Sequence, residues 1–189
     1  EYGRKAMKKK RAAAVIAALS AACLFSGCAN AVQDGTEALE AKDYETAAQE
    51  FQTAAADEDK ETAAEGYRGL GMVSYETGDY AEALEAFESA LDNGAEQTIE
   101  LYNLMGVSAM QTGDYARGLE YIQSGLAMAD ASDGGDEDDS LIREMEYNEI
   151  ICYEQQSDWE NAKAKITEYI NKYPDDEAAQ REAEFLQTR

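Results

Sequence analysis

The sequence holds few residues that could carry out covalent chemistry. It has no histidine, so the usual general base, the commonest metal ligand and every Ser-His or Cys-His pair are missing. Its three cysteines are Cys23 and Cys28, near the end of an N-terminal apolar run, and Cys152. A thiol is a soft nucleophile that can be acylated, which makes Cys28 a candidate for modification. Cys152 has no neighbouring basic cluster to lower its pKa, so we expect an inert core or groove residue and no disulfide.

The first 27 residues have the composition of an export signal. Four basic residues follow Met7, then comes an apolar run over 12–25, and two small residues precede Cys28. An apolar run of about 14 residues is short for a bilayer span, which needs about 20. We therefore expect residues 1–27 to be a removable signal peptide, with Met7 as the true start.

Residues 24–28, Leu-Phe-Ser-Gly-Cys, resemble the lipobox of bacterial lipoproteins. That resemblance implies lipidation of Cys28, cleavage before it, and anchoring on the extracytoplasmic face of the cell membrane. Phe25 stands where the family usually has Leu, and Cys23 fits the pattern less well. Two acyl chains make attachment durable, because each buried methylene contributes about 0.8 kcal/mol. An uncleaved anchor helix and an unlipidated secreted protein are the alternatives.

The charge balance excludes one class of partner. The formal net charge is -24, and it becomes more negative without the leader, which holds six basic residues and one acidic residue. Because so acidic a surface repels phosphate backbones, we exclude nucleic acid as a partner. A charged partner should be basic or carry cations. The alternative is that the charge only keeps an exported protein soluble.

A short turn pattern recurs along the rest of the chain. Its four copies are Lys42-Asp43-Tyr44, Gly78-Asp79-Tyr80, Gly113-Asp114-Tyr115 and Ser157-Asp158-Trp159. The aromatic residues of successive copies are 36, 35 and 44 positions apart. Periods of this size are typical of solenoids. A composition rich in Ala, Glu and Leu with a single proline predicts an all-α protein.

The residues around these turns resemble the tetratricopeptide repeat (TPR). In the second copy, Tyr67-x2-Leu70-Gly71 precedes the turn and Ala83-x3-Phe87 follows it, as in the W-x2-L-G…A-x3-F pattern. The resemblance implies a right-handed α-solenoid within residues 28–189. It consists of about four helix-turn-helix repeats and a C-terminal capping helix, expected at about 28–61, 64–97, 99–132, 141–174 and 176–186.

Small residues are expected where the two helices of one repeat cross. Gly71 should lie opposite Ala83, and Gly106 opposite Gly118, because bulk at these positions forces the helices apart. A large residue such as Phe87 then fills the space toward the next repeat. The predicted repeat-packing residues are thus Gly71, Ala83, Phe87, Gly106 and Gly118.

Three further features complete the expected architecture. Gly78 and Gly113 should end the first helices of their repeats in the left-handed conformation. The acidic loop 132–140 accounts for the longest spacing; it lacks the EF-hand order, so we expect a connector, with a calcium loop as the alternative. In the capping helix, the residues expected to cover the open end of the stack are Ala178, Phe185 and Leu186.

The TPR resemblance also implies a binding groove lined by the first helices of successive repeats. The positions that match are Arg68, Met72, Tyr75, Asn103, Val107, Met110 and Asn148. Because an asparagine amide both donates and accepts hydrogen bonds, Asn103 and Asn148, with Arg68, are expected to hold the backbone of a bound peptide. The alternative is that these are solvated groove residues.

Together these features predict a membrane-anchored, extracytoplasmic bacterial scaffold that binds a protein or peptide. Neither catalysis, a cofactor nor a metal is expected. Within the scaffold class, a secretion or envelope-assembly factor is the alternative. An extracytoplasmic hydrolase would need paired carboxylates in a rigid cleft, and no pair stands out among the scattered acidic residues. A solute receptor would need a larger two-lobed chain with a deep pocket.

Overall fold

The computed structural model describes residues 28–131 and 139–189, so the expected signal peptide and most of the acidic loop lie outside the described residues. The described residues form helices and no strands, which confirms the predicted all-α fold class. None of these helices is long and apolar enough to cross a membrane. The helices are α1 (Cys28–Glu40), α2 (Tyr44–Ala55), α3 (Lys60–Thr77), α4 (Tyr80–Asp92), α5 (Ile99–Gln111), α6 (Tyr115–Ala131), α7 (Asp139–Gln155), α8 (Trp159–Lys172) and α9 (Glu177–Leu186).

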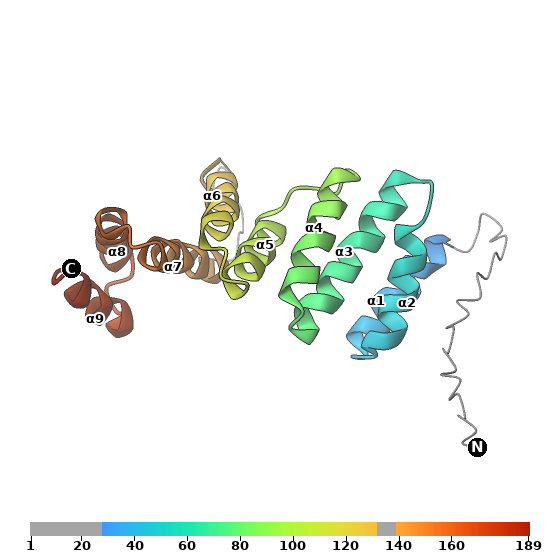
Figure 1. Ribbon diagram of the computed structural model, residues 1–189, viewed down its shortest axis with the longest axis horizontal. Helices are drawn as coiled ribbons and strands as arrows, with labels where there is room; N and C mark the ends of the chain where they lie inside the picture. The colour runs from blue at the N-terminus through green and yellow to red at the C-terminus, as the bar shows by residue number, and fades with distance from the viewer. Residues whose placement is uncertain (1–27, 132–138) are drawn as a thin grey trace, which may run out of the picture.

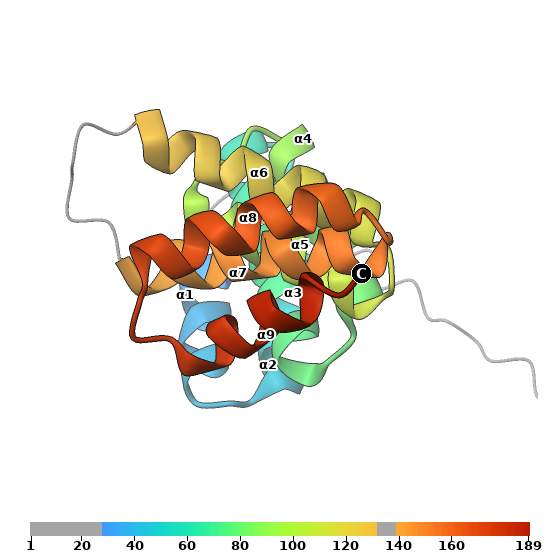
Figure 2. The same ribbon diagram turned by 90° about the vertical axis from the view of Figure 1, so that its left-hand side faces the viewer.

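The helices pair into antiparallel hairpins that stack along one axis (Figure 1). The α1–α2 hairpin stands at one end, and α9 lies against α8 at the other end (Figure 2). Each helix packs against the next one in the chain, and the first helices of neighbouring repeats also touch, α1 with α3 and α5 with α7. Since each repeat contacts only its neighbours, the fold is a solenoid.

The turn between the two helices of each repeat uses one left-handed residue. Gly78 and Gly113 adopt φ values of 85° and 84°, which confirms the expected helix ends. Lys42 and Ser157 occupy the same place in the first and fourth repeats, with φ values of 59° and 60°. The turn geometry is therefore kept even where the residue is not glycine.

The predicted repeat-packing residues all lie in the interior. Ala83 and Phe87 are completely buried, and the three glycines are buried as well. A Cβ added to Gly71 would come within 2.4 Å of the Phe87 ring, and one added to Gly106 within 2.7 Å of Ile122. Glycine at these positions thus lets the second helix of a repeat lay a large side chain directly on the backbone of the first.

Two glycines with no role in the sequence-based pattern bring neighbouring repeats together. A Cβ on Gly66 would lie 2.2 Å from the backbone nitrogen of Ala55, and one on Gly69 would lie 2.2 Å from the Phe51 ring. Both glycines are on α3, whereas the atoms they approach are on α2. The close approach of repeat one to repeat two therefore depends on them.

The capping helix buries a different stripe from the expected one. Ala179, Ala183 and Leu186 are buried, whereas Ala178 is exposed and Phe185 is 43% exposed. The prediction was right for Leu186 and wrong for the other two. Residues 179, 183 and 186 follow i, i+4, i+7 spacing and so share one helix face, from which Ala178 is displaced by about 100°.

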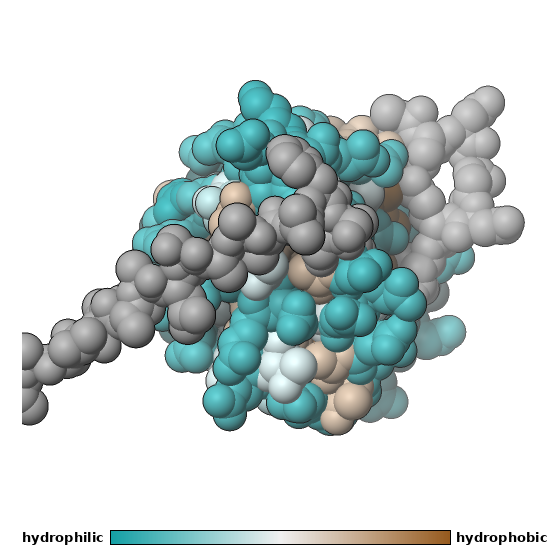
Figure 3. All heavy atoms as spheres, turned by 90° about the vertical axis from the view of Figure 1, so that its right-hand side faces the viewer, coloured by the Kyte–Doolittle hydropathy of each residue, from teal (hydrophilic) through white to brown (hydrophobic). Residues whose placement is uncertain are grey.

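At the opposite end of the stack the visible surface is mainly hydrophilic (Figure 3).

Candidate functional site

The first helices of repeats one to three enclose a cavity that we call the groove pocket. Its volume is about 350 Å³, and its walls come from α1, α3 and α5, with Phe51 of α2 behind them. Apolar side chains predominate, including Leu39, Met72 and Leu104. The complete lining is Val32, Thr36, Leu39, Phe51, Glu65, Arg68, Gly69, Met72, Thr98, Glu100, Leu101 and Leu104.

The charged side chains at the groove pocket leave it acidic. The Arg68 guanidinium pairs with the Glu65 carboxylate at 2.6 Å, so its charge is balanced locally. Glu100 adds a further carboxylate to the lining. A smaller adjoining cavity of about 250 Å³ shares Leu39 and Met72 with the groove pocket and carries two more carboxylates and one lysine.

A second cavity of about 350 Å³ lies between α7 and the capping helix. Its lining includes Asn148 and Arg143. Arg143 donates hydrogen bonds to the Tyr169 hydroxyl at 3.0 Å and to the Asp176 carboxylate at 2.6 Å, and its guanidinium lies 4.9 Å from the Tyr173 ring centre. These contacts tie the first helix of the fourth repeat to the start of α9.

Two family models, both described as tetratricopeptide repeat, match this chain over residues 33–98 and 147–176. Together they cover just over half of the 189 residues. The chain belongs to the tetratricopeptide-repeat family. The α5–α6 hairpin lies outside both matches, yet it forms the same kind of helix pair.

Solved structures with the same fold include two TPR-like chains. One is YrrB, described as a TPR protein with an unusual peptide-binding site; the TM-score is 0.69 at 18% identity, covering 84% of this chain and 75% of that one. The other is the MamA RS-1 ArsTM double mutant, with a TM-score of 0.69 at 15% identity, covering 87% and 85% of the two chains. At such identities the likeness shows the fold alone. No curated protein matches the sequence.

The TPR fold brings only some of the predicted groove residues to a cavity. Arg68 and Met72 line the groove pocket, whereas Asn148 lines the cavity beside α9. Tyr75 is half-buried and packs edge-on against Tyr80, with ring centres 5.5 Å apart. Its pKa is raised by burial and by Tyr80. The predicted groove residues that reach a cavity thus line two separate cavities at different ends of the solenoid and do not form one continuous row.

Two of the predicted groove residues on α5 are engaged inside the protein. Met110 packs against the cluster around Ile122, and its Cγ would lie 2.9 Å from a Cβ added to Gly118. Asn103 is only 8% exposed, and its Oδ1 atom is buried with no hydrogen-bond partner in the described part of the chain. Val107 is half-buried. Sequence periodicity located the helix but not which way each side chain turns between its neighbours.

Apart from Met72, the apolar lining of the groove pocket was not predicted from the sequence. Leu39, Leu101 and Leu104 form much of that lining, together with Phe51 from a second helix. The signal that could have found Leu104 is its spacing of i+4 from Glu100 on a TPR first helix, which places both on one face.

One carboxyl group near the cap, that of Glu154, has a raised pKa. Burial raises the pKa of the Glu154 carboxyl to about 7, and Glu182 on α9 adds to the shift through its charge and a hydrogen bond. The Oε1 atom of Glu154 is buried and has no other partner among the described residues. The Glu154 carboxyl is therefore partly protonated near neutral pH.

The remaining thiol is not a reactive group. Cys152 is completely buried, and burial, with a contribution from Glu149, raises the pKa of its thiol to about 12. The thiol thus stays protonated, and it lies in the core and not in the groove. Within residues 28–131 and 139–189, no three His, Cys, Asp or Glu side chains gather in a way that could hold a metal ion.

Proposed function

We propose that this TPR protein is a non-catalytic scaffold that binds a protein or peptide, anchored through an acylated Cys28 on the extracytoplasmic face of a bacterial membrane. The groove pocket is the observation that carries the binding part of the proposal. TPR first helices from three successive repeats meet there around an apolar floor. A cavity of this kind accepts an apolar side chain while its rim sets the orientation of the rest of the chain.

The rim favours a basic segment as the occupant. Arg68 and Glu65 pair with each other, so Glu100 is the lining carboxylate with which a positively charged neighbour of the bound apolar residue would pair. The net charge of -24 extends this preference to the approach of the ligand. The predicted ligand is therefore a segment with one or two large apolar residues flanked by Lys or Arg.

The anchoring part of the proposal rests on the lipobox-like residues 24–28. Cys28 is the cysteine of that pattern and would become the new N-terminus after the expected cut. An acylated Cys28 would then hold the first repeat close to the membrane surface.

The binding proposal is tested with three fluorescent peptides of equal length: apolar with basic flanks, apolar with acidic flanks, and basic without apolar residues. Anisotropy titration should give the tightest binding for the first. The double change Met72→Ala and Leu104→Ala should weaken that binding at least about tenfold, because central apolar contacts carry most of the affinity. Met128→Ala on α6, away from the groove pocket, is the matched control. Equal binding of all three peptides, or equal affinities of the variants, would refute the proposal.

The anchoring proposal is tested separately in a bacterial host. Metabolic labelling with an alkyne fatty acid should label the chain, and fractionation should place it with the membranes. Cys28→Ser should abolish the label and release the protein, whereas Cys23→Ser should leave both unchanged. Labelling that survives Cys28→Ser would contradict this anchor without bearing on the groove.

A further inference from the structure

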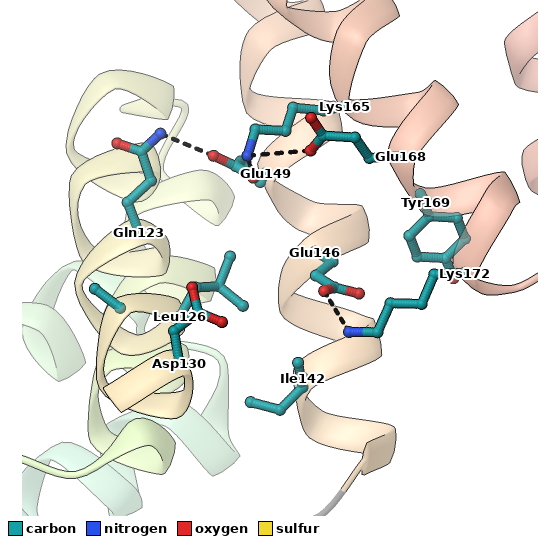
Figure 4. Close-up of a pocket in the computed structure, with 11 residues that line it drawn as sticks. Gln123, Leu126, Asp130, Ile142, Glu146, Glu149, Lys165, Glu168, Tyr169 and Lys172 are labelled. Atoms are coloured by element: carbon teal, nitrogen blue, oxygen red, sulfur yellow. Dashed lines mark hydrogen bonds and ion pairs between the residues drawn. The ribbon is translucent and has the colours of Figure 1, made fainter. Parts of the chain in front are cut away.

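A separate cavity lies between the second helices of repeats three and four, and we call it the α6–α8 pocket. Its volume is about 390 Å³, and its walls are α6 and α8, with α7 forming the floor (Figure 4). Its charged and amide side chains are Gln123, Asp130, Glu146, Glu149, Lys165 and Lys172, with Glu168 at the edge of α8. Its walls are second helices of their repeats, whereas the groove pocket is lined mainly by first helices.

The equivalent junction between repeats two and three is closed by side chains. Arg117 and Tyr121 of α6 both donate hydrogen bonds to the Glu88 carboxylate of α4. Arg117 also lies over the Tyr121 ring, 5.9 Å from its centre. A guanidinium therefore joins two successive second helices at this junction.

The matching residues at the next junction differ. Counting from the first residue of each second helix, Gln123 takes the place of Glu88, Lys165 that of Tyr121, and Asn161 that of Arg117. Asn161 is exposed and donates a hydrogen bond to Asp158 at 2.7 Å, back along its own helix. The position that supplies the guanidinium at one junction thus supplies no cation at the other.

Gln123 and Lys165 turn instead to the floor of the pocket. Both contact the Glu149 carboxylate, Gln123 Nε2 at 2.8 Å and Lys165 Nζ at 3.1 Å (Figure 4). Glu149 is only 3% exposed. Each of its two oxygens has a partner, so this buried charge is satisfied without a ligand.

Glu146, one turn earlier on the floor, is only half satisfied. Its Oε1 atom accepts a hydrogen bond from Lys172 Nζ at 2.7 Å, whereas Oε2 is buried with no partner in the described ranges. A buried carboxylate oxygen without a donor is costly, because it has lost water and gained nothing in return. Asp130 faces the same space from α6, so carboxylates stand on the floor and on one wall.

We propose that the α6–α8 pocket binds an arginine side chain of a partner protein. A guanidinium carries five N–H donors in a planar fork, so one group can pair with carboxylates on two helices, here Glu146 of the floor and Asp130 of the α6 wall. The lining holds more carboxylates than lysines, which favours a cation. The cavity is at the small end of the range of about 300–1,000 Å³ for ligand pockets, which suits one long side chain. The bound arginine would have the same role at this junction that Arg117 has at the junction between α4 and α6.

The proposal is tested by NMR titration of the ¹⁵N-labelled full chain with Nα-acetyl-argininamide. The expected result is dose-dependent shifts of the Gln123 side-chain amide and of backbone amides around Glu146 and Lys172. The neutral isostere Nα-acetyl-citrullinamide should cause no such shifts, and Nα-acetyl-lysinamide should bind more weakly. Shifts confined to the groove pocket, equal shifts with the citrulline probe, or equal binding of the lysine probe would overturn the proposal.

Two variants sharpen the test. Glu146→Gln should weaken binding of the arginine probe about tenfold or more, because it removes a charge-assisted hydrogen bond. Glu160→Gln removes the same charge from an exposed site on α8 and should leave binding unchanged. If circular dichroism shows that Glu146→Gln is unfolded, Asp130→Asn on the exposed wall provides the same comparison. Equal affinities of the pocket variant and the Glu160→Gln control would refute the assignment.

Discussion

Replacing Gly66 with alanine should destabilise this TPR solenoid, although the same change in an ordinary helix stabilises. Gly66 lies inside α3, where alanine is favoured over glycine by about 1 kcal/mol. The added Cβ, however, would lie 2.2 Å from the backbone nitrogen of Ala55 and 2.7 Å from its Cα. These are backbone atoms at the end of α2, which cannot rotate out of the way as a side chain can.

The size of the effect follows from these two opposing contributions. Restoring an ordinary contact requires α2 and α3 to separate by about 1 Å, and overpacking of this kind costs about 3 kcal/mol at the upper end of its usual range. Subtracting the gain in helix propensity leaves a net loss of about 2 kcal/mol. For a domain of this size that corresponds to a melting temperature lower by about 4–8 °C.

Urea and thermal unfolding followed by circular dichroism at 222 nm measure this loss. Ala164→Gly, on an exposed position within α8, is the control that reports helix propensity alone. Hydrogen exchange should show faster exchange in α1 and α2 than in α7 and α8, because repeats pass strain only to their neighbours. The groove pocket borders the same junction through Phe51 and Gly69, so peptide affinity should fall as well.

A stabilised Gly66→Ala variant would refute the reasoning. If the change raised the free energy of unfolding by about 1 kcal/mol, equal and opposite to the effect of Ala164→Gly, helix propensity would account for the whole effect. The close approach of α3 to α2 would then not be a determinant of how the repeats stack.

Three further predictions follow from single residues. Glu154→Gln should raise stability above pH 7 and flatten the pH dependence of stability between about 4.5 and 7. The folded Glu154 carboxyl has a pKa near 7 and holds a proton that the unfolded chain releases. Its contribution to stability is therefore full below the ordinary pKa and is lost as the pH rises through 7. Unfolding curves across this pH range measure this dependence, and an unchanged slope would contradict the raised pKa of Glu154. Ser157→Gly should stabilise by up to about 1 kcal/mol, because it relieves a left-handed φ of 60°. The reverse change, Gly78→Ser, should destabilise by a similar amount in the same urea assay, and a result of the same sign for both would count against the strain. Cys152 should resist iodoacetamide at pH 8 until urea unfolds the chain, since its thiol is buried with a pKa of about 12; peptide mass spectrometry measures this, and rapid native labelling would disprove it.

The helix pairs were predictable because their signals are local. The recurring turns at Gly78 and Gly113 need a left-handed residue followed by a new helix, and this requirement is visible in a few adjacent positions. The crossing of Gly106 with Gly118 was also predictable: a Cβ added to Gly118 would lie 3.3 Å from the Gly106 carbonyl oxygen, whereas Gly71 faces the Phe87 ring and not Ala83 as expected. The TPR resemblance of residues 67–87 then joined these local features into one fold.

The orientation of side chains between repeats was not predictable in the same way. Met110 and Tyr75 stand at groove positions in the sequence pattern, yet both are half-buried against side chains of neighbouring helices. A helical period gives the angle at which a side chain leaves its helix but not what the neighbouring helix places there. The wrong stripe assigned to α9 has the same origin, since the apolar residues Ala178 and Phe185 sit one step from the face that docks.

By itself, the sequence determined the all-α class, the repeat period and the acidic character of this TPR protein, because each depends on residue types and short spacings. Only the tertiary structure decided how closely the repeats approach at Gly66, where the groove pocket lies, and that a cavity separates α6 from α8. These features arise where helices distant along the chain meet. Their contacts depend on interatomic distances that must be correct to within about 1 Å, and no residue pattern encodes such distances.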